Sequence, residues 1–71
     1  MNVGKSIKIV LAQRELKQPW LAGKLSMSTQ QISRLSNSTS ASSRTIDRIS
    51  EAFKMSSSEF IALGEIDYEQ N

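Results

Sequence analysis

The 71-residue sequence contains neither cysteine nor histidine. Without cysteine, disulfide bonds and thiolate–metal ligands are excluded, and a reducing cytosol is a compatible environment. Without histidine, the most common zinc ligand and the most common general acid–base group are missing. The sequence also lacks a paired-carboxylate arrangement of the kind that hydrolytic enzymes use. We therefore expect no enzymatic activity, no metal site and no cofactor.

Long apolar runs are absent as well. No segment approaches the roughly 20 apolar residues of a membrane-spanning helix, and the N-terminus lacks the apolar stretch and cleavage site of a signal peptide. We expect no membrane partner. A chain of 71 residues has room for one small domain, so homodimerisation is the remaining way to bury more surface.

Charge is distributed unevenly along the chain. Residues 1–64 carry all nine basic side chains and four of the seven acidic ones, a net charge of +5, whereas the other three acids lie in the last seven positions. We therefore divide the chain into a domain at 1–64 and an acidic C-terminal tail at 65–71. The basic body favours a polyanionic partner, although charge alone fits an ordinary solvated surface equally well.

Apolar spacing and capping residues predict three helices in the first half of the chain. The first covers 3–15, with Asn2 as a possible N-cap. The second ends at residue 25 and begins near 17 or 18, because Pro19 is tolerated only in a first turn. Ser28 or Thr29 caps the third, which runs to about residue 36. Trp20 is expected to close the edge of the core.

Two further helices are predicted after the serine-rich stretch 36–43, which we interpret as a loop. Ser43 is expected to cap the fourth helix. Ser56 and Glu59 have the spacing of a capping box for a fifth at 57–63, and Gly64 is a typical C-terminal stop. The second and third helices are joined by only three or four residues, which is the spacing of a helix-turn-helix.

The segment from Leu16 to Asn37 resembles the helix-turn-helix of phage lambda-type repressors and Cro proteins. The similarity extends over about residues 3–64 and implies an all-α, five-helix, lambda-repressor-like domain whose helices 2 and 3 form the helix-turn-helix. The matching residues, apart from the small-residue turn, are Gln18, Leu21, Ala22, Leu25, Ile32, Leu35 and Asn37, followed downstream by Ile46, Ile49, Ala52, Phe53 and Phe60.

Polar side chains without any acid are left on the outer face of the third helix when Ile32 and Leu35 point inward. Glutamine can pair with adenine and arginine with guanine through two hydrogen bonds. In phage repressors, residues near the start of this helix reach base edges in the major groove. The resemblance therefore implies base contacts by Thr29, Gln30, Gln31, Ser33 and Arg34. The alternative is a solvated helix face.

Phosphate contacts are implied at two other places. Gln18 stands where family members anchor a phosphate at the start of helix 2. Asn37, Ser38 and Thr39 stand where the loop after helix 3 holds further phosphates, and Arg44 where some members reach toward the minor groove. The alternative for this loop is a flexible connector.

The sequence departs from the family pattern at several positions. Ser26 replaces the common glycine of the turn and must adopt a less favourable backbone conformation or shift the turn. Ser38 replaces the common glycine after helix 3. A frequent arginine–glutamate pair between helices 1 and 3 is lost, because its positions correspond to Leu11 and Ser36.

Apolar residues near the C-terminus exceed what one small domain needs. They extend the core or, as the resemblance implies, form a dimer interface; they are Ile61, Leu63, Ile66 and Tyr68. The resemblance implies a Cro-like phage or prophage repressor, nucleoid-associated in the bacterial cytoplasm, that binds a symmetric double-stranded operator as a homodimer without a small-molecule ligand. The alternative is a protein-interaction module, such as an antitoxin or an anti-regulator, that binds through its tail.

Overall fold

The computed structural model describes residues 2–65, which form five α-helices and no strand. The helices are α1 (Val3–Gln13), α2 (Gln18–Leu25), α3 (Thr29–Ser36), α4 (Ser43–Ala52) and α5 (Ser57–Glu65). The predicted all-α architecture is therefore confirmed, with α2 and α3 as the close helix pair. No helix of this region is long and apolar enough to cross a membrane.

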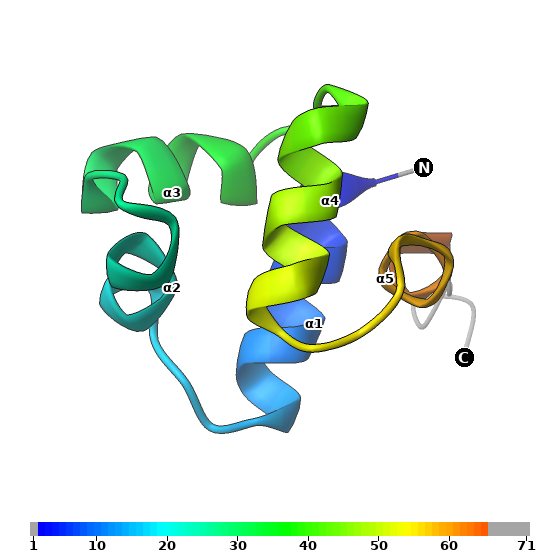
Figure 1. Cartoon of the computed structure of the whole chain (residues 1–71), viewed down its shortest axis with the longest axis horizontal. Helices are drawn as coiled ribbons and strands as arrows, with labels where there is room; N and C mark the ends of the chain where they lie inside the picture. Colours follow the sequence, from blue (N-terminus) through cyan, green and yellow to red (C-terminus); the bar gives the residue numbers. More distant parts are fainter. Residues whose placement is uncertain (1, 66–71) are drawn as a thin grey trace.

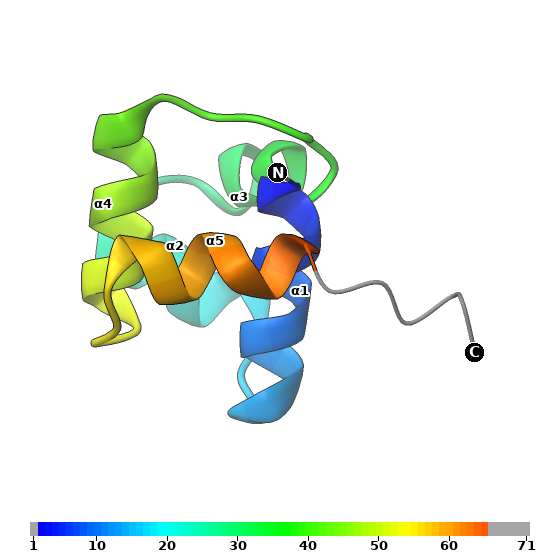
Figure 2. The same cartoon turned by 90° about the vertical axis from the view of Figure 1, so that its right-hand side faces the viewer.

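The helices α1 and α4 stand at the centre of the molecule (Figure 1). The pair α2 and α3 covers one side of them, and α5 lies on the other side. Figure 2 shows α5 running across α1 and α4. Because α1 packs against both α3 and α5, it connects the two sides of the domain.

Most helix starts lie where the sequence predicts them. The Asn2 side chain accepts a hydrogen bond from the Lys5 N–H at 3.0 Å, and Pro19 lies in the first turn of α2. Ser56 and Glu59 form the predicted capping box: the Glu59 carboxylate accepts from the Ser56 N–H at 3.0 Å. This backbone bond and the Ser56 side chain lower the pKa of Glu59. Each cap of this kind stabilises a helix by about 0.5–2 kcal/mol.

Three predicted helix boundaries are wrong. The helix α1 ends at Gln13 rather than at residue 15, because Glu15 has a positive φ of 55° that no helix continues. The N-cap of α4 is Ser42 rather than Ser43: the Ser42 hydroxyl accepts from the Thr45 N–H at 3.2 Å. The helix α5 extends two residues beyond the predicted end, to Glu65.

Gly64 does not end α5. It lies inside α5 and is buried, so the predicted helix stop is wrong. A Cβ at this position would overlap the backbone oxygen of Asn2 and the hydroxyl of Ser6. The missing side chain therefore allows α5 to pack closely on α1. Ser6 is itself fully buried, and its hydroxyl has no hydrogen-bond partner within residues 2–65.

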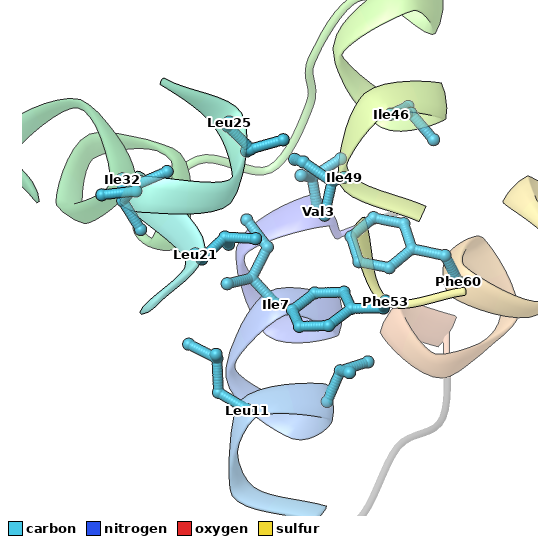
Figure 3. Packing of buried hydrophobic residues seen from close by; sticks show 12 residues of the cluster. Val3, Ile7, Leu11, Leu21, Leu25, Ile32, Ile46, Ile49, Phe53 and Phe60 are labelled. Atoms are coloured by element: carbon cyan, nitrogen blue, oxygen red, sulfur yellow. The ribbon is translucent and has the colours of Figure 1, made fainter. Parts of the chain in front are cut away.

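The core brings apolar side chains from all five helices together (Figure 3). Phe53 and Phe60 are its largest fully buried side chains, and burying one such ring stabilises the fold by about 1.5–3 kcal/mol. Trp20 is half-buried and stacks on Phe53, with 5.7 Å between ring centroids. The prediction that Trp20 closes the edge of the core is confirmed.

We expect Gly64→Ala and Gly23→Ala to change stability in opposite directions. Overpacking at Gly64 should lower the free energy of unfolding by about 1–3 kcal/mol. Gly23 lies in α2, where an added Cβ would meet no neighbouring atom within 4 Å, so alanine there should raise it by roughly 0.5–1 kcal/mol through helix propensity. Thermal and urea unfolding measure both changes. A Gly64→Ala variant as stable as Gly23→Ala would contradict the close packing of α5 on α1.

Candidate nucleic-acid interface

A three-residue turn, Ser26 to Ser28, joins α2 to α3. Ser26 adopts the left-handed conformation, with φ of 56° and ψ of 43°. Of the two predicted alternatives, the serine therefore takes the less favourable backbone conformation and the turn is not shifted. The Met27 N–H donates to the Ala22 carbonyl at 2.9 Å and closes the end of α2. Ser28 then begins the next helix. Leu21 and Leu25 of α2 lie buried with Ile32 of α3, as Figure 3 shows.

The helix α3 separates apolar from polar side chains. Ile32 and Ser36 are buried, and Leu35 packs at the edge of the core. The five predicted base-contact residues are all exposed: Thr29, Gln30, Gln31, Ser33 and Arg34. The structure thus brings them together on one accessible helix face. Except for Thr29, they line one polar concavity together with Ser28 and Asn37.

Gln31 has a local role that is not among the sequence-based predictions. Its side-chain oxygen accepts from the Ser28 N–H at 2.9 Å, while the Gln31 N–H donates to the Ser28 hydroxyl at 3.1 Å. This reciprocal pair is a capping box at the start of α3. The serine followed three residues later by glutamine is a recognised sequence signal for it. Gln31 therefore also positions the backbone of the helix that presents its neighbours.

Gln18 links the start of α2 to the end of α3. Its side-chain nitrogen donates to the buried Ser36 hydroxyl at 3.4 Å. Ser36 is one of the two positions at which family members often carry an arginine–glutamate pair. The other position, Leu11, is buried in the core. An uncharged hydrogen bond and apolar packing thus occupy these places, which avoids the cost of burying a charge.

Hydrogen bonds of both side chains and backbone fix the loop after α3. Asn37 donates its side-chain N–H to the Ser33 carbonyl at 3.1 Å, and the Ser38 hydroxyl donates to the Arg34 carbonyl at 3.0 Å. The carbonyl of Ser38 accepts from the Gly4 N–H at 2.8 Å. The loop therefore has a defined path across the start of α1. Of the other predicted phosphate-contact residues, Thr39 and Arg44 are exposed.

Several basic side chains stabilise the domain instead of facing the predicted interface. Arg48 donates to the Leu25 carbonyl at 2.7 Å and so caps the C-terminal end of α2, where a positive charge is favourable. Arg14 lies 5.7 Å from the Phe53 ring centroid and Lys24 5.6 Å from that of Trp20. Because the contacts of Arg48 and Arg14 join segments far apart in the chain, no local sequence pattern indicates them.

Of the predicted dimer-interface residues, Ile61 and Leu63 are half-buried and pack against the core. Each contributes to the core and leaves part of its side chain accessible. Ile66 and Tyr68 lie outside the described residues, and the boundary at residue 65 stays a prediction.

Comparison with known proteins identifies one family. The family model of the Cro/C1-type HTH DNA-binding domain matches residues 6–64, which include all five helices in whole or in large part. No curated protein and no solved structure matches the chain. The family match confirms the resemblance that the sequence motifs carry.

The strained turn predicts that one substitution stabilises the domain. We expect Ser26→Gly to raise the free energy of unfolding by about 0.5–1 kcal/mol, because glycine relieves the left-handed strain at some cost in chain entropy. Ser33 is an exposed interior position of α3. Ser33→Gly should lower the free energy of unfolding by roughly 0.3–0.5 kcal/mol, because glycine has the lower helix propensity. Urea unfolding compares the two. Equal destabilisation by both would contradict the turn geometry.

Proposed function

This chain belongs to the family of Cro/C1-type helix-turn-helix DNA-binding domains, and we propose that it is a Cro-like repressor of a phage or prophage that binds a two-fold symmetric operator as a homodimer. Membership of the family makes it a DNA-binding transcription regulator. The family is typically non-enzymatic.

The observation that carries the proposal is the exposed, acid-free face of α3. Its side chains offer amide, hydroxyl and guanidinium groups, which are the groups that read base edges in the major groove. Gln30 and Arg34 are exposed and line the same concavity. The capping box at Ser28 and the buried Ile32 hold this helix rigidly, so its outer side chains are presented in a defined register.

The proposed phosphate contacts come from residues on either side of the exposed α3 face. Gln18 lies at the start of α2, while Asn37, Ser38 and Thr39 begin the loop after α3. Arg44 lies in the first turn of α4, at the far end of the same loop. Contacts of this kind orient the protein and make binding depend on salt, whereas the base contacts of α3 supply sequence preference.

A homodimer supplies the two-fold symmetry. The partly accessible Ile61 and Leu63 of α5 support an apolar contact between two copies, to which Ile66 and Tyr68 of the tail are proposed to contribute. Two recognition helices would then enter major grooves about one turn, roughly 34 Å, apart.

Selection of bound sites from random duplexes tests the repressor proposal. We expect a two-fold symmetric consensus for the native chain. Gln30→Ala should change the preference at one position in each half-site and weaken binding there by about 1–3 kcal/mol. Gln13→Ala is the matched control, because Gln13 is exposed at the end of α1 rather than on α3. If no sequence is enriched at moderate salt, the operator proposal is wrong.

Deleting residues 66–71 tests the tail. If Ile66 and Tyr68 support the dimer, the deletion should weaken binding to a full operator and lower the dimer fraction in sedimentation, while a single half-site binds with unchanged affinity. Full-operator affinity equal to that of the native chain would instead assign the tail to another protein partner, such as a toxin or a second regulator.

A further inference from the structure

A second polar concavity lies beside the recognition face, where α1 meets the loop after α3. It is lined by Asn2, Lys5 and Lys8 of the α1 end and by residues 36–39. Two of the lining residues are cationic and none is acidic. Asn37 lines both this concavity and the one on α3. The two concavities are therefore neighbours on one continuous surface.

The geometry of α1 directs both lysines toward this loop. Lys5 and Lys8 are three residues apart and so share one face of the helix. Helical side chains lean toward the N-terminal end of their helix, and the N-terminal end of α1 is the end that contacts the loop, through hydrogen bonds from Val3 to Thr39 and from Gly4 to Ser38. Lys8 is exposed, and Lys5 is half-buried.

Several hydrogen-bond donors around the concavity are already used within the domain. The Asn37 amide and the Ser38 hydroxyl donate to carbonyls of α3. The backbone N–H groups of Val3 and Gly4 donate to the loop. A phosphodiester accepts hydrogen bonds and donates none, so it needs donors or positive charge from its site. At this site, the lysine ammonium groups are the side chains that supply positive charge.

We propose that Lys8 binds a phosphodiester of the DNA backbone that flanks the base pairs contacted by α3, and that the charge of Lys5 adds to the positive potential beside it. This site extends the interface of the proposed function onto α1 and rests on that function. Lysine suits the role because its compact charge binds phosphate without a fixed orientation. Such a contact adds affinity and salt dependence but no sequence preference.

The test measures affinity for duplex DNA against salt concentration, by fluorescence anisotropy, with the full chain. Lys8→Gln should reduce the slope of log K against log salt by about 0.9 for each protomer bound, as expected for one lost phosphate contact. The affinity loss should be several-fold at low salt and should shrink as salt rises. Lys8→Arg should keep the native slope, and the selected consensus should be the same for all variants.

Lys54→Gln is the matched control. It removes the same charge, but Lys54 follows the end of α4 that lies away from the loop, and the ten residues of α4 span about 15 Å. We expect this variant to keep the slope of the native chain. Because Lys8 and Lys54 are both exposed, thermal unfolding should be the same for the variants and the native chain.

Measuring both the selected operator and a random duplex separates the two proposals. Equal slopes for Lys8→Gln and Lys54→Gln on both duplexes would overturn the α1 site, while an enriched symmetric consensus would leave the repressor proposal standing. If no consensus is enriched but Lys8→Gln still lowers the slope on random DNA, the site stands and the operator proposal is wrong. Absence of any duplex binding by the native chain overturns both.

Discussion

The close approach of α1 to the chain that follows α3 is the contact on which the rest of the interface depends. A Cβ on Gly4 would overlap the backbone of Ser36 and Ser38, so α1 can lie this close to the end of α3 only because residue 4 has no side chain. The Gly4 N–H then donates to the Ser38 carbonyl. One residue of α1 thereby allows the close contact with the end of the recognition helix and fixes one point of the loop beside it.

Polar residues around α3 divide into two groups. Some hold the helix: Ser28 and Gln31 cap its start, and Asn37 and Ser38 bind carbonyls of its last turn. Others face outward from a backbone that is thereby held in place. Rigid support of this kind reduces the entropy that a side chain loses when it binds a base or a phosphate. Capping and recognition are therefore complementary uses of the same short polar segment.

How well the fold could be predicted depended on how local each signal is. The start of α2 at Gln18 follows from Pro19, and the fifth helix from the spacing of Ser56 and Glu59, because these signals act within one turn. The predicted cap of α4 lies one residue too late, because the adjacent Ser42 and Ser43 offer equivalent capping hydroxyls. The spacing of apolar residues predicts the outward face of α3, but it gives Gln31 a base contact alone and not its place in a capping box.

The sequence by itself determined the all-helical class, the helix-turn-helix and the five exposed polar residues of α3. Helical periodicity and helix caps depend only on residues that are close together in the sequence. Only the tertiary structure decided what Gly4 and Gly64 do, since a glycine that ends a helix and one that admits a second helix look alike in sequence. It also decided which cations support the fold: Arg48 reaches a carbonyl 23 residues away. The grouping of Lys5 and Lys8 with residues 36–39 likewise arises from packing, because contacts between distant segments depend on how whole helices fit together.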